Sequence, residues 1–248
     1  MDLLNPVFLA SLFVFIGTLV RSAVGFGDTM IALPLLVLLF PLDFAVPLLA
    51  IFSSLISMIV VAIHWREVRF KNAIHFIIAC AITLYPGMLL SKSDYEIPMK
   101  IGLGVVIAGF ALFKLVYKGT VELRSDRLLY PFGIVGGILG GAFGMNGPPV
   151  VIFGSLRKWD PNAFRATLQG IFLFTGPMIL MAHGIGGNIT PGVLKQVGWS
   201  LPGVLAAVAL GLYIGQRWSM AKFHRYVYMV LVLTGVMQIS FALKESMA

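Results

Sequence analysis

The chain has 248 residues and a formal net charge of +8, with 59% hydrophobic and only 11% charged residues. A soluble domain carries roughly 25% charged residues, so this sequence lacks the polar side chains that a water-exposed surface requires, and a soluble globular protein is excluded. The basic residues lie in short segments between apolar stretches, where the positive-inside rule accounts for them without a nucleic-acid partner. The composition predicts an integral membrane protein whose partner is the lipid bilayer.

The first half of the chain begins with an interrupted apolar region. Residues 6–40 would form a helix ~50 Å long, but Gly25-Phe26-Gly27 breaks them, so we predict a hairpin of two half-helices that folds into the membrane. Residues 6–24 are also long enough to span the membrane alone. Three uninterrupted stretches of spanning length follow, at residues 44–64, 73–90 and 101–117.

The second half repeats this order. Residues 131–156 are apolar but are broken by the segment from Gly144 to Pro149, which leaves arms of about 13 and 10 residues that reach roughly half-way across a bilayer. We predict a second re-entrant hairpin here. Three stretches of spanning length again follow, at residues 166–182, 197–215 and 226–243.

A shared spacing indicates an internal repeat. At an offset of 119 residues, four positions of the first half match identical residues of the second: Gly17 and Gly136, Ala23 and Ala142, Gly25 and Gly144, and His64 and His183. Two halves that each carry a helix-breaking cluster in an apolar stretch are typical of secondary transporters. We predict an all-α polytopic membrane protein with an N-terminal repeat (1–120) and a C-terminal repeat (121–248), each a broken or re-entrant helical hairpin followed by three transmembrane helices.

The loop charges predict that the two repeats have inverted topology. If each hairpin returns to the side from which it starts, thirteen Lys and Arg residues lie on one face of the membrane and four on the other. The first group is Arg66, Arg69, Lys71, Lys114, Lys118, Arg124, Arg127, Arg157, Lys158, Arg165, Arg217, Lys222 and Arg225; the second is Lys92, Lys100, Lys195 and Lys244. This bias places the basic loops in the cytoplasm and both termini outside it. Each half then crosses the membrane an odd number of times, so the two hairpin tips approach each other near the midplane.

A new helix is predicted to begin after each break, at Asp28-Thr29 and at Gly147-Pro148-Pro149. Asn146 is a favourable N-cap residue, and proline suits a first turn because its missing N–H would be unpaired there. Each helix start offers free N–H groups and a partial positive charge, which together bind anions. We expect the two starts to hold one small anion, with the binding residues Arg21, Gly25, Gly27, Asp28, Thr29, Gly144, Asn146, Gly147, Pro148 and Gln169.

Several of these residues have a second interpretation. Arg21, the only strong base inside an apolar stretch, contacts the anion or gates its path, or else forms an internal ion pair with Asp28. Asp28 in turn caps the helix that it begins, or binds a proton or a coupling cation. The glycines from Gly136 to Gly144 allow close helix packing as well as a break. Thr167 and Gln169 form hydrogen bonds between helices, or line the site.

No metal or cofactor site is expected. The histidines His64, His75, His183 and His224 have no metal-ligand spacing, and His64 and His183 are expected at the membrane surface, where loops begin. No catalytic motif is present, which disfavours an enzyme.

Several of the motifs resemble those of the TauE/SafE family of sulfite exporters. They are the segment Arg21 to Gly27 with Leu33-Pro34-Leu35, the segments Gly136 to Gly141 and Gly147 to Pro149, and the stretch Asp160 to Gln169. The resemblance implies export of sulfite, sulfonates or related organic anions across a bacterial plasma membrane. It carries over Gly25, Gly27, Gly144, Gly147, Pro148 and Pro149. Asp28-Thr29 departs from the family pattern, which has more glycine after the first break.

The sequence thus predicts a secondary transporter that exports small sulfur-containing or organic anions by alternating access, with the anion held between the two hairpin tips. Two alternatives remain open, an anion channel and a cation- or proton-coupled uptake transporter that uses Asp28. A homodimer is one possible assembly.

Overall fold

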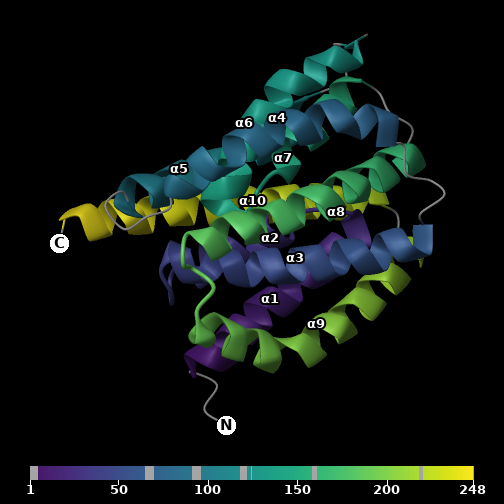
Figure 1. The fold of residues 1–248 in the computed structure, drawn as a ribbon. Coiled ribbons are helices and arrows are strands. Elements are labelled where there is room, and N and C mark those ends of the chain that lie inside the picture. Colours follow the sequence, from purple (N-terminus) through teal and green to yellow (C-terminus); the bar gives the residue numbers. More distant parts are fainter. Residues whose placement is uncertain are drawn as a thin grey trace. The chain divides into compact units, whose positions relative to one another are not determined.

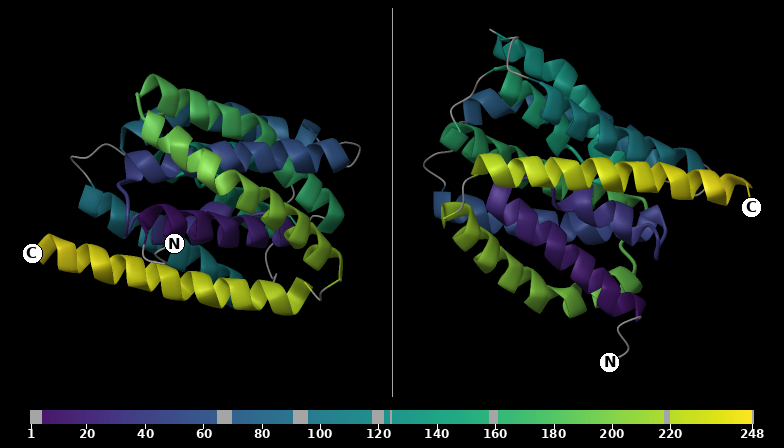
Figure 2. Two further views of the ribbon diagram at one scale, coloured as in Figure 1. Left: turned by 90° about the horizontal axis from the view of Figure 1, so that it is seen from below. Right: turned by 180° about the vertical axis from the view of Figure 1, so that it is seen from behind.

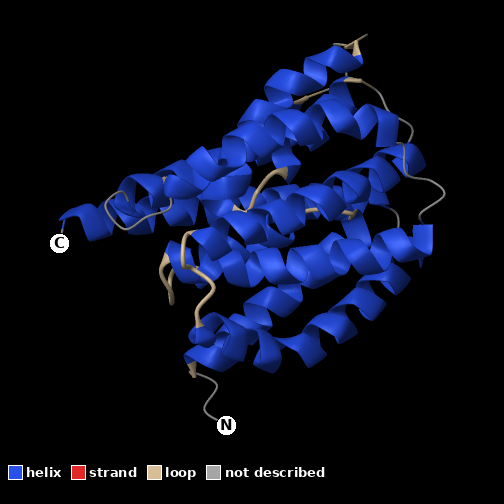
Figure 3. Ribbon diagram, in the orientation of Figure 1, coloured by secondary structure: helices blue, strands red, loops and turns tan. Residues whose placement is uncertain are grey.

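The computed structural model describes residues 5–64, 70–90, 96–117, 122–123, 125–157, 161–217 and 220–247. These ranges are helical apart from short connections and contain no strand (Figure 3). The helices are α1 (Pro6–Val24), α2 (Asp28–Leu36), α3 (Leu42–His64), α4 (Phe70–Leu89), α5 (Glu96–Val116), the short 3₁₀ helix η3 (Asp126–Leu128), α6 (Leu129–Phe143), α7 (Gly147–Leu156), α8 (Pro161–Ile185), α9 (Pro191–Arg217) and α10 (Met220–Met247). The all-helical prediction is confirmed for this part of the chain.

Each of the six predicted spans corresponds to one helix. They are α3, α4, α5, α8, α9 and α10. Each begins a few residues before its predicted start; α3, α4 and α5 end within one residue of the predicted end, and α8, α9 and α10 continue past it by two to four residues. By length and apolar composition, six of the described helices can cross a bilayer: α1, α3, α5, α8, α9 and α10. The described apolar part of α4, Ala73–Leu89, is slightly shorter. Because α1 belongs to this set, residues 6–24 have the length to span the membrane.

Both predicted helix breaks are present and have the same local geometry. Gly25 ends α1 and Gly144 ends α6, each in the left-handed conformation, with φ of 99° and 66°. Glycine adopts this conformation without the steric cost of a Cβ atom. The N–H of Gly25 donates to the Arg21 carbonyl at 2.6 Å, and the N–H of Gly144 donates to the Gly140 carbonyl at 2.8 Å. These bonds close each helix, and the chain then reverses into α2 or α7.

The helix bounds follow the offset of 119 residues that the glycines predicted. The ends of α1 and α6 (Val24 and Phe143), the starts of α2 and α7 (Asp28 and Gly147), and the starts of α3 and α8 (Leu42 and Pro161) all match at that offset. The repeat is therefore visible in the secondary structure around both breaks. The relative orientation of the two repeats stays a prediction.

The chain forms two compact units, and each takes helices from both halves of the sequence. Unit 1 comprises residues 1–49, 91–116 and 189–248, and unit 2 comprises residues 50–90 and 117–188. The hairpin α1–α2 thus belongs to unit 1, together with α5, α9 and α10, whereas α6–α7 belongs to unit 2, together with α4 and α8. The repeat boundary between residues 120 and 121 stays a prediction.

In unit 1, helices pack closely at glycines. A Cβ atom on Gly17 of α1 would lie 2.6 Å from the Asp28 carbonyl oxygen, so α1 and α2 touch through their backbones. A Cβ on Gly104 of α5 would lie 2.6 Å from the Gly235 carbonyl oxygen of α10. Small residues at such crossings let membrane helices gain van der Waals contact. Figure 1 shows α9 beside α1, and α10 is a single uninterrupted helix in both views of Figure 2.

A polar cluster joins α1 and α9 in the same unit. Gln196 of α9 donates from Nε2 to the Val7 carbonyl at 3.0 Å, and the same atom lies 3.1 Å from the hydroxyls of Ser11 and Ser200. Gln196 is 3% exposed and Ser200 is 1% exposed. Hydrogen bonds of this kind hold transmembrane helices together, because hydrocarbon offers no competing partner.

An ion pair joins α5 and α10 of unit 1. Nζ of Lys100 lies 3.0 and 2.9 Å from the two carboxylate oxygens of Glu245. The start of α5 and the end of α10 are therefore at the same end of unit 1, which agrees with the prediction that Lys100 and Lys244 share one face. Most of the basic loop side chains lie outside the described residues, so the sidedness of the loops stays a prediction.

In unit 2, the glycines of α6 serve close packing. Cβ atoms on Gly137 and Gly141 would lie 2.5 Å from the Cys80 carbonyl oxygen and 1.9 Å from the Leu84 carbonyl oxygen, both on α4. Gly140 instead faces the break, because its Cβ would lie 3.3 Å from the Cβ of Asn146. The packing role of these glycines is confirmed, and it accompanies the break at Gly144.

Candidate functional site

An ion pair bridges the first helix break. Nη1 of Arg21 donates a hydrogen bond to Oδ2 of Asp28 at 2.6 Å. Arg21 lies in the last turn of α1 and is 1% exposed, whereas Asp28 is the first residue of α2 and is 8% exposed. Of the two interpretations of Arg21, the internal ion pair is the one that the structure contains. A contact between Arg21 and an anion stays a prediction.

Each member of the pair also lies at a helix end of opposite charge. Arg21 is close to the C-terminus of α1, which carries a partial negative charge, and Asp28 is at the N-terminus of α2, which carries a partial positive charge. The interpretation of Asp28 as a capping residue is wrong, because Gly27 occupies the N-cap position, with φ of 102°, and no side chain caps α2. Asp28 therefore offsets the charge of the helix end without bonding its N–H groups.

The start of α2 has the donors that an anion site requires. The first N–H with an acceptor inside this helix is that of Ile31, which donates to the Gly27 carbonyl at 3.2 Å. The N–H groups of Asp28, Thr29 and Met30 precede it and have no acceptor within the helix. Thr29 is only 4% exposed, and its hydroxyl makes no hydrogen bond within the described ranges. Buried backbone donors and a buried hydroxyl thus lie together beside the ion pair.

At the second break, the predicted capping role of Asn146 is wrong. Asn146 is the N-cap residue of α7, but its side chain makes no capping hydrogen bond. Its backbone is helical, with φ of −83° and ψ of −7°, whereas a capping residue has an extended backbone that turns its side chain toward the helix N–H groups. The Asn146 side chain instead donates from Nδ2 to the hydroxyl of Thr175 on α8. The Thr175 hydroxyl in turn donates a hydrogen bond to the Ile171 carbonyl oxygen at 2.9 Å.

The start of α7 offers fewer donors than expected. Gly147 is its first residue, and Pro148 and Pro149 follow. Proline has no N–H, so two of the first three positions cannot donate to an anion. The two helix starts are therefore unequal, and α2 is the richer in donors.

The remaining polar residues named from the sequence are buried. Gln169 is 4% exposed and Thr167 is 1% exposed, both on α8 of unit 2. Gly147 faces the Phe172 ring, because a Cβ on Gly147 would lie 3.3 Å from that ring. Arg21, Gly25, Gly27, Asp28 and Thr29 belong to unit 1, and Gly144, Asn146, Gly147, Pro148 and Gln169 belong to unit 2. The convergence of the two sets stays a prediction.

The sequence analysis did not predict the buried hydrogen bonds of two polar residues near the second break, Thr175 and His183. Thr175 is the partner of Asn146, and a polar residue inside an apolar span is the signal that points to it. His183 was expected at the membrane surface, but it is fully buried. Its Nε2 lies 3.1 Å from the Gly141 carbonyl oxygen, and its Nδ1 lies 3.0 Å from the amide of Asn188. The expected start of a loop at His183 is wrong, because α8 continues to Ile185 and carries His183 against α6; its depth in the membrane stays a prediction. The side chains of His64 and His224 lie outside the described residues.

No group of three or more His, Cys, Asp or Glu side chains in the described ranges is arranged to hold a metal ion.

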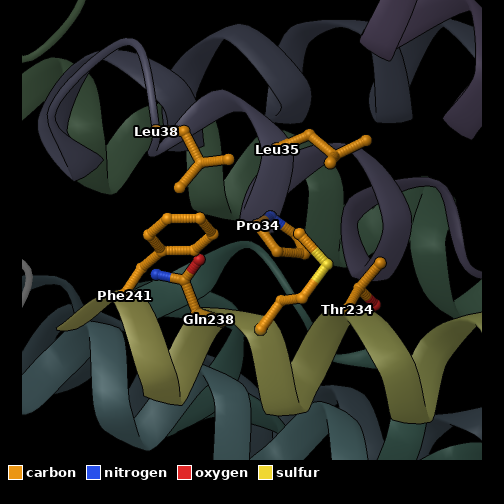
Figure 4. Close-up of a pocket in the computed structure, with 7 residues that line it drawn as sticks. Pro34, Leu35, Leu38, Thr234, Gln238 and Phe241 are labelled. Atoms are coloured by element: carbon orange, nitrogen blue, oxygen red, sulfur yellow. The ribbon is translucent and has the colours of Figure 1, made fainter. Parts of the chain in front are cut away.

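A small pocket that none of the predicted binding residues lines lies between α2 and α10 of unit 1 (Figure 4). It is lined by Pro34, Leu35, Leu38, Thr234, Met237, Gln238 and Phe241. Its volume of about 10 Å³ has room for about one water molecule. Gln238 is 2% exposed and makes no hydrogen bond within the described ranges.

The two buried glutamines of unit 1 make a matched test of helix–helix hydrogen bonding. Gln196→Leu removes the two contacts of Nε2 with α1, to the Val7 carbonyl and the Ser11 hydroxyl, and the one with Ser200 inside α9, so it is expected to destabilise the protein by about 2 kcal/mol. Gln238→Leu removes no such bond and is expected to leave stability unchanged or raised. Thermal unfolding of both purified variants in detergent measures the difference. Equal unfolding temperatures for the two variants would contradict a stabilising role of the Gln196 hydrogen bonds.

Comparison with known proteins agrees with these features. The family described as "Sulfite exporter TauE/SafE" matches residues 9–237, a range that includes both helix breaks. A protein of Cupriavidus necator named "Probable sulfite/organosulfonate exporter TauE" is 25% identical over 181 residues, which cover 70% of this chain and 67% of that protein. No solved structure matches significantly. With the family pattern extending over nearly its whole length and around both broken helices, the chain belongs to the TauE/SafE sulfite exporter family of multi-pass membrane proteins.

Proposed function

We propose that this chain is a secondary transporter that exports small sulfur-containing anions, such as sulfite or sulfonates, across a bacterial plasma membrane by alternating access. The observation that carries the proposal is the pair of helix breaks at corresponding positions, Gly25–Gly27 and Gly144–Asn146, inside apolar regions. An unsatisfied backbone group costs several kcal/mol in hydrocarbon, so breaks of this kind occur where protein, water or a ligand satisfies them. Membership of an exporter family supports the same function.

Reciprocal packing contacts support the inverted repeat. A Cβ on Gly211 of α9 would lie 2.6 Å from the Leu19 carbonyl oxygen of α1. A Cβ on Gly87 of α4 would lie 2.4 Å from the Ile138 carbonyl oxygen of α6. Leu19 and Ile138 are equivalent at the offset of 119 residues. The first arm of each hairpin thus packs on a helix of the other half at an equivalent carbonyl, which supports a two-fold relation between the halves.

In this proposal the anion binds chiefly at the start of α2. The N–H groups of Asp28, Thr29 and Met30 and the Thr29 hydroxyl supply donors, and the start of α7 adds the N–H of Gly147. A rocking movement of one part of the protein against the other exposes the anion to either side. Basic cytoplasmic loops raise the local anion concentration. The membrane potential, negative inside the cell, favours the exit of each net negative charge by ~2.3 kcal/mol per 100 mV. Export therefore requires no coupling ion.

Transport by reconstituted protein tests the proposal. Proteoliposomes loaded with sulfite or methanesulfonate are expected to show saturable efflux that accelerates when the same anion is present outside. Thr29→Ala removes one donor to a charged ligand and is expected to raise KM about tenfold. Thr234→Ala is the matched control, because the Thr234 hydroxyl bonds the Leu231 carbonyl within α10, at 3.1 Å.

The same assay separates the alternatives. Flux that never saturates and shows no counterflow would identify a channel. Efflux that requires an inward cation or proton gradient would identify coupled uptake. Absence of anion flux above that of empty liposomes would overturn the proposal.

A further inference from the structure

The first break contains two opposite charges that cancel. Arg21 and Asp28 are both buried residues, and their side chains are joined at 2.6 Å. The second break contains no charged residue between Leu129 and Leu156, and the positions equivalent to Arg21 and Asp28 are Gly140 and Gly147. The side chains at the two breaks therefore contribute a net charge of zero, despite the arginine.

This neutrality limits the charge of a ligand that binds there. The donors at the start of α2 carry a partial positive charge of roughly half an elementary charge, which compensates about half the charge of a monoanion. A dianion would leave more than one negative charge uncompensated in a buried site, and burial of uncompensated charge is strongly unfavourable. A site without Asp28 would instead have the full positive charge of Arg21 available.

We propose that Asp28 determines the charge of the substrate: by neutralising Arg21 it makes the site bind monoanions, such as sulfonates and the hydrogen sulfite form of sulfite, and reject dianions of the same size. This inference rests on the proposed anion site at α2. It assigns Asp28 a role in specificity that differs from coupling and from capping. It predicts that the protein discriminates against sulfate, although sulfate has the same tetrahedral shape as a sulfonate.

Two probes of matched size test this charge selection. Methanesulfonate carries one negative charge and sulfate carries two, and both are small tetrahedral oxyanions. Their dissociation constants are measured by titration calorimetry on the purified full-length protein at neutral pH. The wild type is expected to bind methanesulfonate at least about tenfold more tightly than sulfate.

A series of variants changes the net charge of the break in single steps. Asp28→Asn raises it to +1 and is expected to shift the preference toward sulfate by about tenfold or more. Arg21→Gln lowers it to −1 and is expected to weaken binding of both anions. The double variant Arg21→Gln with Asp28→Asn restores zero and is expected to keep the preference for methanesulfonate, and it leaves no unpaired buried charge that would prevent folding.

The outcomes are distinct. Equal affinity of the wild type for both probes, or a double variant that prefers sulfate, would overturn the charge selection while the anion site stands. A folded Asp28→Asn variant with the wild-type preference would also overturn it. Binding of neither probe by the wild type would overturn the proposed anion site itself, and the inference with it.

Discussion

Replacing Arg21 with alanine is expected to destabilise the folded protein by about 3–5 kcal/mol. The substitution leaves the Asp28 side chain, which is 11% exposed, without the guanidinium that lies 2.6 Å away. The partial positive charge at the N-terminus of α2 compensates only part of this loss. Thermal unfolding and size-exclusion profiles of the detergent-purified variant measure the effect.

The control for this prediction is the double variant Arg21→Ala with Asp28→Ala. It removes both charges, so no buried charge is left unpaired, and most of the lost stability is expected to return. An Arg21→Ala variant that unfolds at the wild-type temperature would show that the pair contributes nothing to folding. Failure of the double variant to recover would show that Arg21 acts through packing and not through its charge.

Gly141→Ala is expected to disrupt the packing of α4 against α6, at a cost of about 3 kcal/mol or more. The added Cβ would lie 1.9 Å from the Leu84 carbonyl oxygen and 2.5 Å from the Met88 nitrogen. Both are backbone atoms of α4, so no side-chain rotation relieves the overlap, and the two helices must separate. Thermal unfolding in detergent, together with yield from the membrane fraction, checks this expectation.

Gly109→Ala on α5 is the matched control. A Cβ at Gly109 meets no atom within 4 Å, and alanine is the better helix former, so stability is expected to rise by up to about 1 kcal/mol. Similar unfolding temperatures for the two variants would mean that α4 and α6 do not approach as closely as their backbones indicate.

The two helix breaks share a backbone design but differ in chemistry. Both end in a left-handed glycine, Gly25 or Gly144, and both resume as a short helix. The first break then has a buried ion pair and three open N–H groups, whereas the second has two prolines and an asparagine bonded to Thr175. This asymmetry places most of the proposed anion binding at the first break and gives the second a larger part in packing.

Much of this architecture followed from the sequence alone. The hydrophobic stretches and their lengths predicted the six helices, because a bilayer demands about 20 apolar residues per span. The glycines at Gly25, Gly27 and Gly144 predicted both breaks, since only glycine adopts the left-handed conformation without strain. The offset of 119 residues then predicted which elements correspond. These are local properties of the chain, and local sequence is sufficient to determine them.

Tertiary structure decided which partners the polar residues take, including the choice between the two interpretations of Arg21 that the sequence left open. The pairing of Arg21 with Asp28 depends on how sharply the chain turns at residues 25–27, and the bond from Asn146 to Thr175 depends on where α8 lies beside α7. The burial of His183 depends on how far α8 continues past the predicted end of its span. Each of these contacts joins segments whose spacing in sequence does not determine their distance in space, so their physical cause is packing, which no single segment contains.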